Sequence, residues 1–414
     1  MKFGTSLCWW TNIEYPEDTK SKIIDLLFGE DGLQLTVVRY NLGGGENPNK
    51  PMKLRPGGMV PCVKKDNTSD INLNNDKRQK DILDLSIKAG VSEIELFVNS
   101  PPWWMTVSGC TSGTTSPFHC NLRKECIEEY ADFLVSSYNM FKSQNYNIVS
   151  LEPFNEPSNP FWTTSLDQEG CFFPYTIRNK VLKTINKIDC KIPLTDSDEF
   201  SSGFALCRYL FTPKNSVSKV NVHGYKLKYK NVTFHLDDLD VVRKTLRKIV
   251  KKPMWMSEYG QGYKDFKESL NIGRQIFRDL KTFKPEAWIY WQAVENQNGS
   301  MWGLITIPFG NTNINNIIIQ PQYYIFKHFT RSFKDSISYE FVSNNILKIQ
   351  SAKQSTITYI ILNDTNIPIK NTLVISTFAE CRTSCASKVD SLLTVIPSEF
   401  IEYSITSIKI NKLI

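Results

Sequence analysis

Short apolar runs alternate with longer amphipathic stretches over the first 331 residues of the chain. The apolar runs end at turn-forming or charged residues, which is typical of buried parallel strands. The amphipathic stretches carry one apolar stripe and a charged opposite face, which is typical of surface helices. The pattern predicts strands at 3–9, 34–41, 93–99, 148–154, 191–197, 219–224, 253–258 and 286–292. It predicts helices at 18–28, 75–89, 123–143, 173–187, 202–211, 236–250, 266–283 and 321–331.

Eight strand and helix units in strict alternation indicate a closed parallel sheet, a (β/α)8 TIM barrel. After about residue 332 the pattern changes to short runs rich in Ile, Thr, Tyr and Val, separated by polar turns, which indicates an antiparallel β-sandwich. Strands of this second region are expected at 337–341, 346–350, 356–362, 372–377, 392–396 and 400–408. We therefore predict an α/β protein with two domains, a barrel over residues 1–331 and a β-sandwich over residues 332–414.

Composition and charge exclude several classes of protein. The chain has 414 residues, 22% of them charged and 41% hydrophobic, with a net charge of +7, which argues against long disorder. Its basic cluster at 243–252 has apolar residues at helical spacing, so a solvated helix face is favoured over a nucleic-acid surface. No run reaches the ~18 consecutive apolar residues of a membrane span. We expect no nucleic-acid partner, no membrane span and a monomer.

Cysteines and glycosylation sequons bear on the compartment. Ten cysteines and four Asn-x-Ser/Thr sequons favour a secreted or extracellular protein; the sequons are at Asn67, Asn231, Asn298 and Asn363. No signal peptide precedes the first predicted strand, so an intracellular location stays open.

No cofactor or metal ion is expected. The segment Cys381-Arg-Thr-Ser-Cys385 is either a small disulfide loop or a pair of free thiols, and it lacks the second pair that a zinc site needs. Gly43-Gly44-Gly45 lacks the spacing of a phosphate-binding loop and is better explained as a flexible turn.

Two glutamates end strands on opposite sides of the predicted barrel. Glu156 follows the strand at 148–154, and Glu258 ends the strand at 253–258. Barrel enzymes place their catalytic groups at the downstream ends of strands, and carboxyl groups roughly 5 to 5.5 Å apart can cleave a glycosidic bond by double displacement. We expect Glu156 to be the general acid/base, with apolar walls and a neighbouring carboxylate favouring its protonated form. Glu258 should then be the ionised nucleophile.

Other polar side chains at strand ends complete the candidate site. Asn155 is placed to bond a sugar 2-hydroxyl. Arg39 and Tyr225 are expected to keep Glu258 ionised, and Arg39 on a buried strand needs a counter-charge. For His223, a hydrogen-bonded core position and a sugar contact are equally favoured. Further strand-end carboxylates are expected to be salt-bridged surface or loop residues, namely Glu152, Glu199 and Glu295.

Aromatic side chains just beyond strand ends suggest a carbohydrate ligand. Flat indole rings stack on the C–H faces of sugars, and their N–H groups bond hydroxyls. The candidate platforms are Trp9, Trp10, Trp103, Trp104, Phe161, Trp162 and Trp291. By contrast, Trp255 and Trp288 lie inside predicted strands and are expected to pack in the core.

Segments along the whole barrel resemble the retaining glycosidases of clan A, and more closely glycoside hydrolase family 30 with its endo-β-1,6-galactanase branch. These segments are Gly4-Thr-Ser-Leu-Cys-Trp-Trp10, Val38-Arg-Tyr-Asn-Leu-Gly-Gly44, Asn99-Ser-Pro-Pro-Trp-Trp-Met105, Glu152-Pro-Phe-Asn-Glu-Pro157, Gln168-Glu-Gly-Cys171, His223-Gly-Tyr225, Trp255-Met-Ser-Glu-Tyr-Gly260 and Trp288-Ile-Tyr-Trp-Gln292. By this resemblance Glu156 matches the family's acid/base and Glu258 its nucleophile. The resemblance also matches subsite-lining positions to Arg39, Asn155, Tyr225 and Trp291.

The resemblance implies an endo-acting retaining hydrolase of β-1,6-galactan, with an oligosaccharide or polysaccharide as its substrate. Two alternatives stay open. One is a β-1,6-glucanase or glucosylceramidase-like hydrolase, and the other is a carbohydrate-binding pseudoenzyme.

Overall fold

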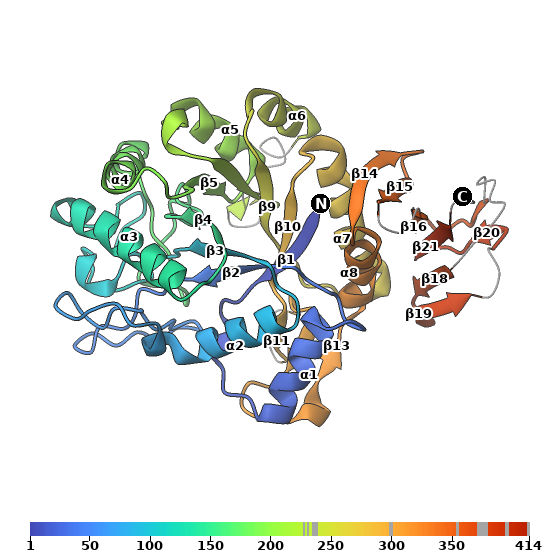
Figure 1. Cartoon of the computed structure of the whole chain (residues 1–414), viewed down its shortest axis with the longest axis horizontal. Helices are drawn as coiled ribbons and strands as arrows, with labels where there is room; N and C mark the ends of the chain where they lie inside the picture. Colours follow the sequence, from blue (N-terminus) through green and yellow to red (C-terminus); the bar gives the residue numbers. More distant parts are fainter. Residues whose placement is uncertain are drawn as a thin grey trace.

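The computed structural model describes residues 1–411 except 227, 230–231, 234–238, 298–300, 353–355, 371–379 and 394–396. A parallel sheet in the order β4-β3-β2-β1-β10-β9-β6-β5 forms the centre of the larger part (Figure 1). Its strands are β1 Lys2–Ser6, β2 Val37–Asn41, β3 Glu93–Phe97, β4 Ile148–Glu152, β5 Thr195–Glu199, β6 Lys219–His223, β9 Met254–Tyr259 and β10 Ala287–Gln292. A parallel bridge between Leu151 and Leu194 joins β4 to β5 and closes the barrel. The predicted (β/α)8 barrel is confirmed.

Helices surround this sheet and alternate with its strands (Figure 1). They are α1 Glu17–Phe28, α2 Lys77–Lys88, α3 Ile127–Ser143, α4 Tyr175–Ile188, α5 Ser202–Phe211, α6 Asp240–Ile249, α7 Phe266–Thr282 and α8 Pro321–Ser332. Short 3-10 turns add η1 Trp10–Asn12, η2 Leu73–Asp76, η3 Trp103–Met105, η4 Lys124–Cys126, η5 Lys214–Ser216 and η7 Ile314–Asn316. The loops carry the short strands β7 Lys228–Tyr229, β8 Val232–Thr233, β11 Val294–Asn296, β12 Ile305–Ile307 and β13 Ile318–Ile319. No helix among the described residues is both long and apolar enough to cross a membrane.

Strand β5 departs from the predicted position. The apolar run at 191–197 predicted the strand, but β5 spans Thr195–Glu199 and is polar at every position, and all of its residues are buried. A polar strand can be buried only if its carboxylates are paired. Cations from other elements meet this requirement, as described below.

A six-stranded antiparallel sheet follows α8 in the order β14-β15-β16-β21-β18-β19. Its strands are β14 Ser336–Phe341, β15 Ile346–Ser351, β16 Thr356–Asn363, β18 Glu380–Cys385, β19 Lys388–Leu393 and β21 Ser404–Asn411, and a separate pair is β17 Ile369–Lys370 with β20 Glu399–Phe400. Helices α7 and α8 lie between the barrel and this sheet (Figure 1). The strand predicted at 372–377 lies outside the described residues. The division into domains at residues 331 and 332 stays a prediction.

The sequence did not predict β18, which carries both cysteines of the suspected disulfide loop. Cys381 and Cys385 are free thiols, and both are buried. Residues four apart on an extended strand are separated by more than twice the Cα distance that a disulfide spans. The free-thiol alternative is therefore the correct one.

Candidate active site

A cavity of about 790 Å3 opens at the downstream ends of the barrel strands. Five predicted site residues line it together: Asn155, Glu156, Tyr225, Glu258 and Trp291. Gln168, from one of the resembling segments, also lines it, as do loop residues that the sequence did not single out, among them Arg55, Gln261 and Trp302. The cavity is therefore built from several loops after the strands, as in other barrels of this architecture.

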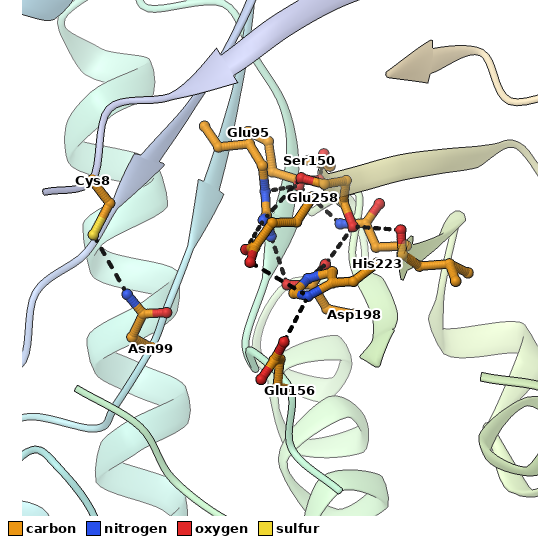
Figure 2. A network of polar contacts seen from close by, with 12 residues as sticks. Cys8, Glu95, Asn99, Ser150, Glu156, Asp198, His223 and Glu258 are labelled. Atoms are coloured by element: carbon orange, nitrogen blue, oxygen red, sulfur yellow. Dashed lines mark hydrogen bonds and ion pairs between the residues drawn. The ribbon is translucent and has the colours of Figure 1, made fainter. Parts of the chain in front are cut away.

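The two glutamates meet across this cavity. One carboxyl oxygen of Glu156, one of Glu258 and one ring nitrogen of His223 all lie within 4.8 Å of one another (Figure 2). Glu156 has a left-handed backbone with φ of 41°, a strained conformation that is common at functional sites. It is held there because its N–H donates to the Asp198 carbonyl at 2.9 Å and its own carbonyl accepts the Trp162 indole N–H at 3.0 Å.

His223 lies beneath the two glutamates and bridges them to Asp198. Its Nδ1 is 3.2 Å from Glu156 Oε1 and 3.7 Å from Glu258 Oε1, and its Nε2 is 3.1 Å from Asp198 Oδ1. Burial acts to lower the pKa of the imidazole, but the charges of Glu258 and Asp198 and the hydrogen bonds to Asp198 and Glu156 outweigh it and raise the pKa to about 10. The imidazolium form of His223 is thus favoured, with a carboxylate oxygen within 3.2 Å of each ring nitrogen.

The same three side chains could in principle hold a metal ion. A metal ligand must be a neutral imidazole with a free lone pair. Because both nitrogens of His223 face carboxylates, the arrangement fits an ion pair better than a metal centre.

A buried ion network supports the site from inside the barrel. Arg39 is 2.9 Å from Glu95, 2.6 Å from Asp198 and 3.6 Å from Glu258. Its predicted counter-charge therefore comes mainly from Glu95 and Asp198. Asp198 also accepts a hydrogen bond at 2.6 Å from the hydroxyl of Ser257, the residue that precedes Glu258 in the chain. Burial tends to raise the pKa of Asp198, but Arg39 and His223 hold it well below its usual range.

The ionisation of Glu258 differs from the prediction. Burial raises its pKa to about 7, while the positive charges of His223 and Arg39 oppose this rise. Tyr225 lies beside it, and burial together with the negative charges of Glu258 and Glu156 raises the pKa of the phenol well above its usual value. Glu258 is therefore ionised only in part near neutral pH, and Tyr225 remains a hydrogen-bond donor.

Four predicted substrate contacts do not line the cavity. Arg39 and His223 are fully buried beneath it, because their strands direct these side chains into the barrel interior. Trp103 and Trp104 lie on η3, where their rings pack edge to face with centroids 5.7 Å apart. The Trp104 indole N–H donates to Glu129 at 3.3 Å, so η3 turns this side chain toward α3 and not toward the cavity.

The remaining aromatic candidates divide between cavity and core. Trp9 and Phe161 line the cavity, whereas Trp10 is fully buried and donates its N–H to the Ser6 carbonyl at 3.0 Å. Trp255 and Trp288 are buried as predicted.

Three carboxylates were predicted to be salt-bridged surface or loop residues; Glu152 and Glu199 are buried instead, whereas Glu295 is half-buried on β11 in the loop after β10, as predicted. Glu199 is fully buried and pairs with Arg178 at 2.6 Å. Glu152 is also fully buried; burial raises its pKa well above the usual value, which favours its neutral form. Glu295 lines the cavity. Each of these glutamates ends or follows a barrel strand, and at that position a side chain can enter the barrel interior or the cavity as easily as the outer surface.

Asp198 and Glu95 organise the ion network, and neither was predicted from the sequence. For Asp198 the sequence did contain a signal. The polar run Thr195-Asp-Ser-Asp-Glu199 fits neither the pattern of a surface helix nor that of a turn. For Glu95 the surrounding sequence is an ordinary apolar strand, and only its partners Arg39 and Lys219 reveal its role.

Comparison with known proteins fits this geometry. Residues 1–196 match the family model described as O-Glycosyl hydrolase family 30. The chain is 28% identical over 366 residues to an endo-beta-1,6-galactanase of Hypocrea rufa, covering 81% of this chain and 72% of that enzyme. It is 25% identical over 224 residues to an exo-beta-1,6-galactobiohydrolase of Bifidobacterium longum, covering 40% of this chain and 15% of that protein.

Solved structures agree on the fold. The catalytic domain of the GH30 xylanase C from Talaromyces cellulolyticus superposes with a TM-score of 0.70 at 14% identity, over 99% of this chain and 96% of the xylanase. The barrel, with its paired glutamates at the downstream ends of the strands, and these relatives identify the chain as a glycoside hydrolase. Within that class the chain is similar to glycoside hydrolase family 30, whose model matches residues 1–196, and to an endo-beta-1,6-galactanase.

Proposed function

We propose that this glycoside hydrolase cleaves β-1,6-linked galactan from within the chain, by double displacement with Glu156 as general acid/base and Glu258 as nucleophile. The observation that carries the proposal is the separation of the two carboxyl groups, which approach within 4.8 Å. Retaining enzymes keep their carboxyl groups roughly 5 to 5.5 Å apart, whereas inverting enzymes leave room for a water between them. This separation supports retention.

Polar groups without partners support a hydroxyl-rich ligand. Among the described residues, Asn155 Oδ1 and the Trp9 indole N–H are buried and have no hydrogen-bond partner, and both residues line the cavity. Buried polar groups are costly unless they are satisfied. A sugar ring with several hydroxyls would satisfy them, and Trp9 and Trp291 would offer ring faces beside it.

The choice of galactan rests on the two relatives, whose names both specify β-1,6-linked galactose. Endo action is supported by the Hypocrea rufa enzyme, which aligns with most of this chain. The cavity volume of about 790 Å3 also exceeds what a single sugar ring needs. We propose that the enzyme acts as a monomer on an extracellular polysaccharide. Of its sequons, Asn67 is exposed and open to glycosylation. The Asn363 amide is buried and bonded to three carbonyl groups, so it is not open to this modification.

Defined oligosaccharides test the substrate. A β-1,6-galacto-oligosaccharide series should give a mixture of shorter oligomers at early times, and β-1,6-glucan and aryl glucosides should be poor substrates. A single disaccharide product from the start would indicate exo action. Preferred cleavage of the glucan would replace galactan with glucan, and binding without hydrolysis at high enzyme concentration would support a pseudoenzyme.

Two variants test the catalytic roles. Glu258→Gln should abolish turnover while the protein stays folded, because an amide conserves volume but cannot attack. Glu156→Ala should slow poor leaving groups by roughly 100- to 10,000-fold and activated aryl galactosides far less, since they need little protonation. Equal loss on both kinds of substrate would contradict the acid/base assignment.

A further inference from the structure

Two cysteines on different loops lie side by side near the mouth of the barrel. Cys120 belongs to the loop between β3 and α3, and Cys171 to the loop between β4 and α4. A parallel backbone bridge pairs Cys120 with Phe172, the neighbour of Cys171. Both are free thiols; Cys171 is buried and Cys120 is half-buried.

The two loops contact each other at further points along their length. The Gly170 N–H donates to the Thr111 carbonyl at 2.9 Å, and the Phe118 N–H donates to the Pro160 carbonyl at 3.0 Å. The rings of Phe118 and Phe172 meet edge to face at 6.3 Å. The cysteines therefore lie in an extended contact between loops, where backbone positions are already matched.

We propose that Cys120 and Cys171 form a disulfide bond when the protein meets an oxidant of the disulfide class, so that this pair is a modification site that joins the two loops. A disulfide requires close approach of the two cysteines, with Cα atoms usually 4.4–6.8 Å apart. Here the bridge between Cys120 and Phe172 and the hydrogen bond between the two thiols already hold the cysteines together. The bond therefore needs little backbone movement.

The two thiols suit different steps of thiol–disulfide exchange. A hydrogen bond from Cys171 lowers the pKa of Cys120, and Cys120 is the more accessible of the two, so its thiolate attacks glutathione disulfide first and releases one glutathione. Burial raises the pKa of Cys171 well above its usual value, and this residue acts second. Its sulfur attacks Cys120 in the mixed disulfide and releases the second glutathione. The two electrons and two protons of the cysteines end on the two glutathione molecules.

The bond would act on the loop that carries Glu156. Beyond Cys171, the Phe173 N–H donates to the Pro157 carbonyl at 2.9 Å, directly after Glu156. A covalent link at Cys171 therefore fixes both ends of this loop against the loop after β3. Because the link is independent of catalysis, its test can fail while the proposed function stands.

Peptide mapping of the unmodified chain tests the proposal directly. The folded protein is equilibrated with glutathione disulfide, its free thiols are alkylated under denaturing conditions, and it is digested without reductant. We expect one linked peptide pair that contains Cys120 and Cys171 and disappears after reduction. Separate alkylation of both residues, or linkage of either to another cysteine, would overturn the proposal.

Thermal unfolding gives a second measurement. A disulfide that closes a loop of about 50 residues should raise Tm by roughly 5 °C in a chain of this length. Reductant should remove this rise in the unmodified chain and in the control Cys207→Ser, which changes an exposed cysteine on α5. Cys120→Ser should have a Tm that does not respond to reductant. A response that persists in Cys120→Ser would contradict the assignment.

Discussion

Replacing Asp198 by asparagine should change the pH dependence of catalysis, although Asp198 does not line the cavity. Its carboxylate faces Arg39 at 2.6 Å and His223 at 3.1 Å and is fully buried. Asparagine has nearly the same shape but no charge, and it can present only one oxygen. With that oxygen toward Arg39, the amide N–H groups face His223, which favours a neutral imidazole over an imidazolium.

The size of the effect follows from the pKa of His223. Its rise from 6.5 to about 10 corresponds to about 5 kcal/mol in favour of the imidazolium, at about 1.4 kcal/mol per pKa unit. Asp198 supplies two of the four contributions that raise the pKa, its charge and its hydrogen bond. Losing roughly half of the stabilisation, about 2–3 kcal/mol, would lower the pKa of His223 by about two units, to about 8, so the imidazole stays protonated below about pH 7.

The direction of the shift follows from the role proposed for Glu258. A nucleophile must be ionised, so activity should fall as the pH drops through the pKa of Glu258, which is about 7. Positive His223 lowers that pKa, and with a pKa of about 8 it keeps its charge in Asp198→Asn while Glu258 titrates. The charge of Asp198 raises the pKa of Glu258, and the substitution removes this effect. The acidic limb of the profile should therefore move to lower pH in Asp198→Asn.

The assay is kcat/KM from pH 5 to 9 on an activated aryl glycoside, with Tm measured in parallel. We expect the acidic limb of Asp198→Asn, with each profile scaled to its maximum, to lie at lower pH, and the difference to vanish toward pH 8. The matched control is Asp196→Asn on the same strand, which breaks a buried pair with Arg208 at 2.8 Å remote from the glutamates. It should lower Tm and leave the pH profile in place. An acidic limb in Asp198→Asn that is unchanged or lies at higher pH would refute the reasoning.

Two further outcomes can be measured. Glu169 is buried, accepts the Gly44 N–H at 2.9 Å and the Asn41 amide at 3.1 Å, and burial raises its pKa to about 8. The contribution of protonated Glu169 to stability is complete below the ordinary pKa of 4.5 and is lost as the pH rises to about 8. Glu169→Gln should therefore flatten the fall in unfolding free energy between these pH values, by at most about 5 kcal/mol. An unchanged pH dependence of the unfolding free energy in urea titrations would contradict this. Removal of divalent ions with EDTA should leave kcat unchanged, because the imidazolium form of His223 is favoured; loss of activity that one added metal ion restores would instead identify Glu156, His223 and Glu258 as ligands.

Local patterns were sufficient to predict most of the barrel. Helix α5 spans Ser202–Phe211, the predicted range, and α7 ends within one residue of its prediction. Amphipathic periodicity is a property of neighbouring residues, so it can be recognised in a single sequence. Strand β5 was displaced because its own residues are polar, and the apolar run that suggested a strand leads into it.

The candidate site was predictable only where topology alone decides. Glu156 and Glu258 end strands of one barrel, and barrel closure brings such ends to one mouth. For Trp103 and Trp104 topology does not decide the position, since a side chain on the loop beyond a strand can turn either way. The η3 turn directs Trp104 toward Glu129, and no local pattern distinguishes this from the position of Trp291.

Strand β5 explains why the ion network could not be found residue by residue. Its three carboxylates each pair with a different arginine: Asp196 with Arg208 at 2.8 Å, Asp198 with Arg39 at 2.6 Å and Glu199 with Arg178 at 2.6 Å. Burying any one carboxylate without its arginine would cost several kcal/mol, so strand and arginines are required together. Arg178 and Arg208 lie on α4 and α5 outside the sheet, whereas Arg39 lies on β2 and contacts Glu258. Only the pair formed by Asp198 therefore connects the stability of the barrel to the charge of its proposed nucleophile.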